Sequence, residues 1–320
     1  MSKLTILYDE PQEAVWFHLL HQELDGVADE AITAVQNKPH LQKIFAYDRP
    51  DIVLLDDLNP ILMIEQTVEV PSGHNVGQRF ARIAAAAECG VPSLYFFPYV
   101  AKKHGGKTAG PRYVNARLFH AIDAMIRTTK TAITTINWPI DGKYEVSRDP
   151  KKNDTVKEYI ATFFDAYHSH GMVGINSALL TSDVHRRMVA ERDAFVANSI
   201  KNPRQYDQPP PSVSIITTDI FIRQYGRAAN NLVRDKSEVV LYNVGMRNIR
   251  SDPYTGMAML YKYLYIARHP MRLLILWFPE ISIAKWRVAA KRGNRKDIRL
   301  FKVVADAIIF SDGFLSKLDL

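Results

Sequence analysis

The segment from Arg49 to Thr67, RPDIVLLDDLNPILMIEQT, constrains the fold more than any other part of the chain. Two apolar runs, IVLL and ILMI, flank the turn-forming residues DDLNP, which is the pattern of a β-hairpin. The second run has no polar residue on either face, as in strands of sheets that are buried on both sides. We therefore expect an α/β domain whose sheet contains this hairpin.

An acidic residue stands at each outer end of the hairpin. If residues 57–59 form a three-residue loop, the strands pair so that Asp51 lies opposite Glu65. Directly opposed residues share a face of the sheet, with Cβ atoms about 4.5–5.5 Å apart. A five-residue loop would place Asp51 opposite Thr67 and keep Glu65 on the same face. A loop of two or four residues would put the two acids on different faces.

Two carboxylates held together at the edge of a core repel each other unless a cation lies between them. Hard divalent cations, above all Mg²⁺, prefer such oxygen ligands, and a metal there can deprotonate a water and offset charge on a phosphoryl oxygen. We therefore expect Asp51 and Glu65 to be metal ligands, with Mg²⁺ as the cofactor of phosphodiester hydrolysis. The alternative is that Asp51 begins a strand at the surface and Glu65 lies at a sheet edge, without a metal.

The first part of the chain alternates helical and extended patterns. Before the hairpin, apolar residues at helical spacing over 11–37 predict a helix, which Gly26 divides into two pieces. After the hairpin we expect a helix over 73–88, a strand over 93–100 and a helix over 113–128. These elements predict one compact αβ domain over residues 1–148.

The rest of the chain separates into a connector and a second αβ domain. Helices over 154–168 and 182–200 and a proline-rich linker over 202–212 predict a helical connector over 149–212. In the second domain, residues 213–320, we expect the strands 213–222, 238–245 and 272–279, a helix over 255–267 and two C-terminal helices. Both halves have the same order of strand, helix and strand, which leaves open whether the second half is a degenerate duplicate of the first.

Positive charge is concentrated in the second domain. The chain has 41 Lys and Arg against 34 Asp and Glu, a net charge of +7. The last 108 residues carry +9 of this and the remainder −2, and residues 285–302 contain eight basic residues and one acid. A cluster this dense is typical of proteins that bind nucleic acid. A solvated helix face is the alternative interpretation.

The hairpin and its flanks resemble the PD-(D/E)XK nuclease superfamily, whose members have the restriction-endonuclease-like fold. In that family a Pro-Asp pair opens one strand, Glu-x-Lys ends the next, and a helix and another strand follow. The matching positions are Pro50, Asp51, Glu65, the helix around 78–87 and the strand 93–97. The resemblance covers residues 12–128, about a third of the chain, and its motif is short. It implies a restriction-endonuclease-like αβββαβ core in a nuclease-like domain over residues 1–148. It also implies that Asp51 and Glu65 bind Mg²⁺ for DNA cleavage.

The chain departs from this family at the lysine, because Thr67 occupies its position. In the family that lysine orients the attacking water, and Thr67, our third catalytic candidate, can hydrogen-bond a water but carries no charge. Lys102, Lys103 and Lys107 are candidate substitutes, or else they lie on a mobile basic loop. The sequence also leaves open whether an acid of the first helix joins the metal site; the candidates are Glu13, Glu23 and Glu30.

Further polar residues are candidates for contacts with nucleic acid. Gln78 and Arg82 share a helix face at i, i+4 spacing and could reach a phosphate, with ordinary surface residues as the alternative. The full set of expected contacts is Gln78, Arg79, Arg82, Lys102, Lys103, Lys291, Arg292, Arg295, Lys296 and Arg299.

By resemblance, we expect a Mg²⁺-dependent DNA endonuclease of the type II restriction class. Double-stranded DNA would be its partner, a homodimer would cut both strands, and a cognate DNA methyltransferase would be encoded nearby. A single cysteine excludes an intrachain disulfide framework and is typical of the cytoplasm, and no apolar run suggests a membrane partner. The alternatives are a non-catalytic nucleic-acid-binding protein with a degenerate nuclease fold, or a repair or RNA nuclease.

Overall fold

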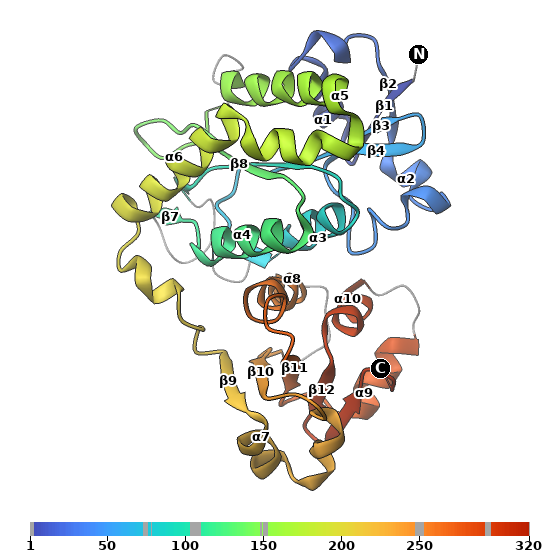
Figure 1. The fold of residues 1–320 in the computed structure, drawn as a ribbon, viewed down its shortest axis with the longest axis vertical. Helices are drawn as coiled ribbons and strands as arrows, with labels where there is room; N and C mark the ends of the chain where they lie inside the picture. Colours follow the sequence, from blue (N-terminus) through green and yellow to red (C-terminus); the bar gives the residue numbers. More distant parts are fainter. Residues whose placement is uncertain are drawn as a thin grey trace. The chain divides into compact units, whose positions relative to one another are not determined.

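The computed structural model describes the chain except for residues 1–2, 73–75, 78, 103–109, 148, 150–152, 247–252, 292–295 and 320. It forms two compact units, each with its own sheet and helices (Figure 1). The first unit consists of Met1–Gly73, Ala81–Ala116 and Met125–Lys201, and the second of His74–Phe80, Arg117–Ala124 and Asn202–Leu320. The expected α/β class is confirmed.

The first unit is built on a six-stranded sheet with the order β2-β1-β3-β4-β5-β8. β1, β3 and β4 are antiparallel neighbours, whereas β4, β5 and β8 run parallel. The strands of this unit, including the separate β6–β7 pair, are β1 (Leu4–Tyr8), β2 (Ala28–Ala31), β3 (Ile52–Asp56), β4 (Asn59–Gln66), β5 (Ser93–Phe97), β6 (Val100–Lys102), β7 (Pro111–Tyr113) and β8 (Ile133–Asn137). The helices up to residue 201 are α1 (Pro11–His18), α2 (Ile32–Val35), α3 (Phe80–Glu88), α4 (Arg117–Thr129), α5 (Asp154–Thr181) and α6 (Asp183–Ser199).

The central sheet is covered by helices on both faces, with α1 and α5 on one side and α3 on the other (Figure 1). Even-numbered residues of the hairpin, such as Leu54, Leu62 and Ile64, pack against α1 and α5 in the main core cluster. Because side chains alternate along a strand, Asp51 and Glu65 point to the opposite face, where α3 lies.

The hairpin keeps the predicted register at the end that carries the acids. Ile52 pairs with Ile64 and Val53 with Met63, as expected. The turn, however, is a two-residue loop, in which Asp57 has a φ of 53°. A β-bulge between Leu54 and Leu55 adds the residue that the shorter loop lacks. The bulge therefore returns both acids to one face.

The helix predicted over 11–37 begins correctly, but its first piece ends after eight residues. α1 ends at His18, and the strand β2 and the short helix α2 follow. Val15 and Leu19, which the helical pattern includes among its apolar positions, are 64% and 68% exposed. From α1 onward the element order is α1-β2-α2-β3-β4-α3-β5, so the helix α2 interrupts the expected αβββαβ order. The sheet neighbour of β3 is β1, a strand that precedes α1 and was not predicted.

The residues expected to form the start of the connector pack into the first unit instead. α5 continues to Thr181 and contains a break at Gly171, whose φ is 56°. Val156, Ile160, Phe163 and Phe164 of this helix belong to the same core cluster as the sheet. Residues up to Lys201 are therefore part of the first unit rather than a separate connector.

The second unit contains a five-stranded sheet with the order β13-β12-β11-β10-β9. β10, β11 and β12 are parallel, and both edge strands are antiparallel to their neighbours. Its elements are β9 (Val213–Thr217), α7 (Thr218–Tyr225), β10 (Glu238–Asn243), α8 (Pro253–Tyr261), β11 (Arg272–Phe278), α9 (Ile283–Lys291), α10 (Lys296–Val304), β12 (Ala307–Phe310) and β13 (Gly313–Ser316).

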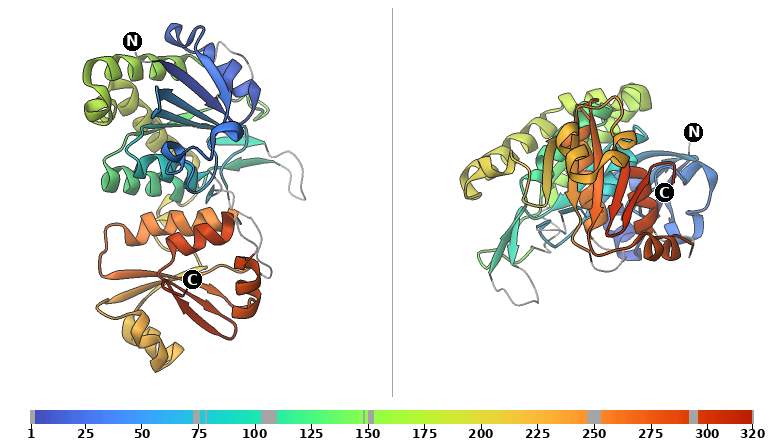
Figure 2. Two further views of the ribbon diagram at one scale, coloured as in Figure 1. Left: turned by 90° about the vertical axis from the view of Figure 1, so that its right-hand side faces the viewer. Right: turned by 90° about the horizontal axis from the view of Figure 1, so that it is seen from below.

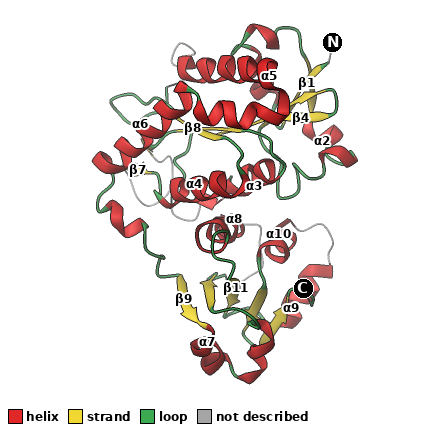
Figure 3. Cartoon of the chain, viewed as in Figure 1, coloured by secondary structure: helices red, strands yellow, loops and turns green. Residues whose placement is uncertain are grey.

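Helices lie on both faces of this second sheet, as the turned views and the secondary-structure colouring show (Figures 2 and 3). α7 packs through Phe221 against Val239 and Ile275. The strand expected over 213–222 ends at Thr217, because the Thr217 side chain caps α7 and turns the rest into helix. The C-terminal hairpin of β12 and β13 was not predicted.

Candidate metal centre

Asp51 and Glu65 meet at the start of β3 and the end of β4. Asp51 is 6% exposed and Glu65 is completely buried. The backbone N–H of Gln66 donates a 2.7 Å hydrogen bond to Oδ2 of Asp51, which fixes that carboxylate beside the end of β4. The juxtaposition that the hairpin predicts is therefore present.

A third side chain, Arg82, joins these two carboxylates. It lies in the first turn of α3, on the face of the sheet to which both acids point. Its Nη1 donates to Oε1 of Glu65 at 2.8 Å and to Oδ1 of Asp51 at 3.1 Å. Its Nη2 lies 3.4 Å from Oδ2 of Asp48. One guanidinium thus bridges three acidic residues.

The charges around Arg82 explain how it is accommodated in a nearly buried position. Burial alone would lower the pKa of the guanidinium. The negative charges of Glu65, Asp48 and Asp51 outweigh this effect and raise the pKa of Arg82 above its ordinary value. Arg82 is therefore a permanent cation that neutralises the acidic cluster.

Glu13 of α1 is a fourth acid near this cluster. The pKa of Glu13 is raised to about 7, chiefly by burial and further by the charges of Asp51 and Asp9, against the lowering effect of backbone hydrogen bonds at Glu10 and Asp9. The other two helix acids considered from the sequence lie elsewhere. Glu23 accepts a hydrogen bond from His168 at 2.7 Å, and Glu30 pairs with Lys38 at 3.7 Å. Of these three acids, only Glu13 has an interaction with Asp51 among the described residues.

The donor set suits a small hard cation, because carboxylate oxygens are the ligands that Mg²⁺ prefers. Within the described part of the chain, no group of three or more His, Cys, Asp or Glu side chains is placed to hold a metal. Asp51 and Glu65 are two such ligands, and Mg²⁺ is commonly bound through one or two carboxylates while it keeps several waters. The guanidinium of Arg82 lies where a cation would contact both.

Thr67 lies directly beyond β4 and is 7% exposed. Its backbone N–H donates to the carbonyl of Phe96 at 3.0 Å, which continues the pairing of β4 with β5. Its Oγ1 accepts a 3.1 Å hydrogen bond from the N–H of Glu69. Among the residues that the structure describes, no acceptor is shown for the hydroxyl proton of Thr67.

Of the other sequence candidates up to residue 107, the structure describes Lys102 and Arg79. Lys102, in β6, is about half exposed and pairs with Glu145 at 3.2 Å. Arg79 precedes α3 and is partly buried. Gln78, Lys103 and Lys107 lie outside the described residues.

The basic segment of the second unit spans α9, the start of α10 and the residues between these helices. Lys291 ends α9 and is exposed. Arg292 and Arg295 lie outside the described residues, and the side chains of Lys296 and Arg299 in α10 are likewise not described. The expected contacts with nucleic acid at these positions therefore stay predictions.

Comparison with known proteins gives no relative: no family model, no curated protein and no solved structure matches the chain. A search of the described helices finds no segment with the length and apolar character needed to cross a bilayer.

The role of Arg82 as the partner of the acids was missed from the sequence, where it was a candidate phosphate contact. This role could have been inferred from the position of Arg82 in the first turn of the helix that follows β4. A helix that crosses over to a parallel strand returns along the sheet, and its first turn lies near the end of the strand that it leaves. Asp48 was missed as well, although it stands only three residues before Asp51.

Proposed function

We propose that the first unit is a Mg²⁺-dependent endonuclease that hydrolyses phosphodiester bonds of double-stranded DNA. One observation carries the proposal: two buried carboxylates from adjacent strands contact the same cationic nitrogen, Nη1 of Arg82. Acidic side chains are costly to bury together, and sites that bind and use cations are a recurrent reason for such clusters.

In this function Asp51 and Glu65 would hold the metal, which when bound supplies a water of lowered pKa and an electrophile for the phosphate. The hydrogen bond from Gln66 keeps Asp51 oriented, so that the two carboxylates need little rearrangement. Thr67 is two residues beyond Glu65, and its hydroxyl would donate a hydrogen bond at the site of attack. When a divalent cation binds, the guanidinium of Arg82 would turn to a phosphate oxygen of DNA.

The decisive experiment is cleavage of supercoiled plasmid DNA with Mg²⁺ or Mn²⁺. We expect Asp51→Ala and Glu65→Ala to reduce the rate by at least about a hundredfold, since each removes a ligand of the metal. Glu30→Ala is the matched control, because Glu30 is an acid of the same unit whose partner is Lys38. Cleavage that survives both substitutions would overturn the site assignment.

The type II restriction class, the homodimer and the neighbouring methyltransferase are finer parts of the same proposal. A single acidic cluster per chain would cut one strand, so cutting both strands at one position favours two copies. Sedimentation of the protein with and without duplex DNA tests the dimer. A chain that cuts duplex DNA only as a monomer would contradict it.

The contacts of Arg82 also favour a second function, that of a non-catalytic nucleic-acid-binding protein. If the guanidinium is a permanent replacement for the metal, the acids serve only to stabilise the fold. Tight binding of DNA without cleavage in any divalent metal would support this function. Repair or RNA cleavage is tested in the same assay with structured DNA and RNA substrates.

A further inference from the structure

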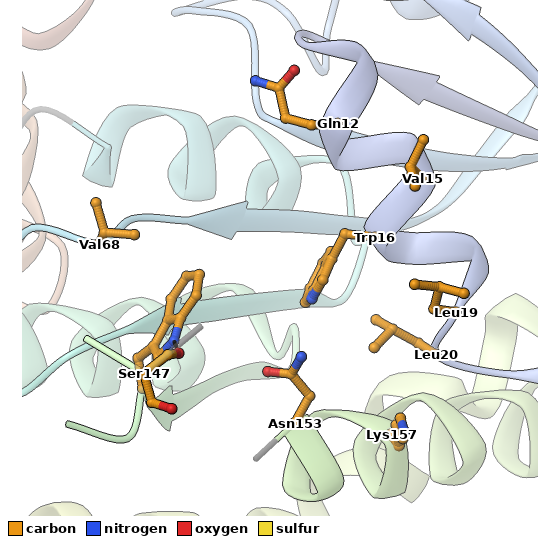
Figure 4. Close-up of a pocket in the computed structure, with 10 residues that line it drawn as sticks. Gln12, Val15, Trp16, Leu19, Leu20, Val68, Ser147, Asn153 and Lys157 are labelled. Carbon is orange, nitrogen blue, oxygen red and sulfur yellow. Dashed lines mark hydrogen bonds between the residues drawn. The ribbon is translucent and has the colours of Figure 1, made fainter. Parts of the chain in front are cut away.

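A pocket of about 360 Å³ lies on the other face of the first sheet, between α1, the start of α5 and residues that follow β4 and β8 (Figure 4). Its volume falls at the lower end of the range of about 300–1,000 Å³ that is typical of small-molecule sites. Val15 of α1 and Leu19, the residue after the end of α1, line it and are 64% and 68% exposed. Large apolar side chains that stay this exposed at the rim of a pocket indicate a ligand site.

Two tryptophans of this pocket have nearly parallel rings. Trp16 and Trp138 each stack on the buried Phe96, at 8° and 12° between ring planes. Nε1 of Trp138 donates a 2.8 Å hydrogen bond to the carbonyl of Ser147, which fixes the orientation of its ring. Phe96 thus covers part of each tryptophan ring, and the ring surfaces that line the pocket are held in fixed orientations. Held aromatic surfaces favour a planar ring as ligand, because stacking gains most from flat surfaces in contact.

The polar residues of the pocket define what that ring should carry. Gln12 and Asn153 provide amides, each of which offers both donors and an acceptor to the edge of a heterocycle. Lys157, one turn beyond Asn153 on α5, provides a positive charge (Figure 4). None of the described residues that line the pocket is acidic. The complementary ligand is thus a planar heterocycle with an anionic group.

We propose that this pocket binds a nucleotide, with the base against Trp16 and Trp138, the base edge at Gln12 and Asn153, and the phosphate at Lys157. The pocket opens at the same edge of the sheet as the acidic cluster, since Val68 and Trp138 follow the ends of the parallel strands β4 and β8. Gln12 is also adjacent in sequence to Glu13. The inference goes beyond the proposed nuclease and does not depend on cleavage.

Calorimetric titration of the full chain with dAMP, dCMP, dGMP and dTMP tests the proposal, with deoxyadenosine and deoxyribose 5-phosphate as probes that lack one half of the ligand. We expect the nucleotides to bind more tightly than either half alone. Trp16→Ala should weaken dAMP binding at least about tenfold, and Trp16→Phe should restore most of it. Lys157→Gln should weaken binding of dAMP but not of deoxyadenosine, and Lys317→Gln, at an exposed lysine of the second unit, should change neither.

Two further arms identify the source of the nucleotide. Competition by a short single-stranded oligonucleotide, but not by the same strand with abasic sites, assigns the pocket to a base of a nucleic acid strand. Failure of that competition assigns it to a free nucleotide. Asp51→Ala should retain dAMP binding, which separates this test from that of the nuclease. The proposal is overturned if no nucleotide saturates the protein at millimolar concentration, if deoxyribose 5-phosphate binds as well, or if folded Trp16→Ala binds unchanged.

Discussion

Nη1 of Arg82 lies 2.8 Å from Oε1 of Glu65, a carboxylate with no exposed surface. Removing one partner of a buried pair leaves the other charge uncompensated, which costs about 3–5 kcal/mol. We therefore expect Arg82→Ala to lower the free energy of unfolding by that amount in urea denaturation. Arg187→Ala is the control, because Arg187 forms an exposed ion pair with Glu158 and should cost at most about 1 kcal/mol. Equal losses for the two variants would contradict the role given to Arg82.

The same substitution tests whether the acids bind a divalent cation. Without the guanidinium, Asp51 and Glu65 lose the cation that neutralises them, so Mg²⁺ or Mn²⁺ should replace it. We expect millimolar Mn²⁺ to raise the melting temperature of Arg82→Ala by several degrees and that of the wild type by less. A double variant that also carries Glu65→Ala should lose this response. A melting temperature of Arg82→Ala that does not depend on the metal would argue for a purely structural acidic cluster.

Glu13 predicts a particular dependence of stability on pH. Its pKa is about 7 in the folded protein, compared with an ordinary value of 4.5, chiefly because of burial. Between these two values the folded state holds a proton that the unfolded state has released. The contribution of Glu13 to stability should therefore fall as pH rises from about 4.5 to 7.

The measurement is the free energy of unfolding as a function of pH in wild type and in Glu13→Gln. In Glu13→Gln the free energy of unfolding should fall less between about pH 4.5 and 7 than in the wild type, because the titrating carboxyl is gone. In Glu30→Gln the fall should be the same as in the wild type. A curve for Glu13→Gln that is parallel to the wild type across this window would show that the pKa of Glu13 is not raised.

A close backbone approach in the second unit makes Gly256 sensitive to substitution. A Cβ atom there would overlap the carbonyl oxygen of Gly77, so the backbone must move. We expect Gly256→Ala to destabilise the protein by about 1–3 kcal/mol, as overpacking does. Gly142→Ala, which has no atom within 4 Å of its added Cβ, should stay within about 0.5 kcal/mol in the same thermal unfolding assay. A neutral Gly256→Ala would show that the two segments can separate freely.

The basic segment is tested by reversing charge at Arg292, Arg295 and Lys296. If these residues bind DNA phosphates, affinity should weaken and the slope of log K against log salt should become shallower by nearly one for each phosphate that is no longer neutralised. Fluorescence anisotropy with labelled duplex DNA between about 50 and 200 mM salt measures both effects. An unchanged slope would show that the segment is only solvated. The same conclusion would follow if the charge reversal weakened the affinity for an uncharged ligand as much as the affinity for DNA.

The sequence was sufficient for those parts of the molecule that follow from local rules. The hairpin, its register at Asp51 and Glu65, and the α/β class depend on apolar alternation and on strand pairing, which are readable from neighbouring residues. The end of α1 at His18 was not, because residues 19–37 keep an apolar spacing that fits a helix while their tertiary contacts favour β2 and α2. Long-range packing decides such segments.

In the acidic cluster, too, the contacts within the hairpin were predictable and the long-range contacts were not. Asp51 and Glu65 were predicted because they belong to one hairpin, but the contact of Arg82 with both depends on where α3 lies across the sheet. The raised pKa of Glu13 depends likewise on burial of α1. The two-residue loop at Asp57 was missed because, together with the β-bulge, it pairs Leu54 with Leu62. A three-residue loop without a bulge would give the same pairing.

That bulge has a consequence for how the site could vary between related chains. It separates the length of the turn from the alignment of the acids, because one residue can be exchanged between loop and strand without moving Asp51 relative to Glu65. Insertions or deletions of one residue near Asp57 could then accumulate as compensated pairs. Relatives of this chain could therefore differ in the spacing between their two acids and still share the same carboxylate geometry, so a search with a fixed motif length would pass over them.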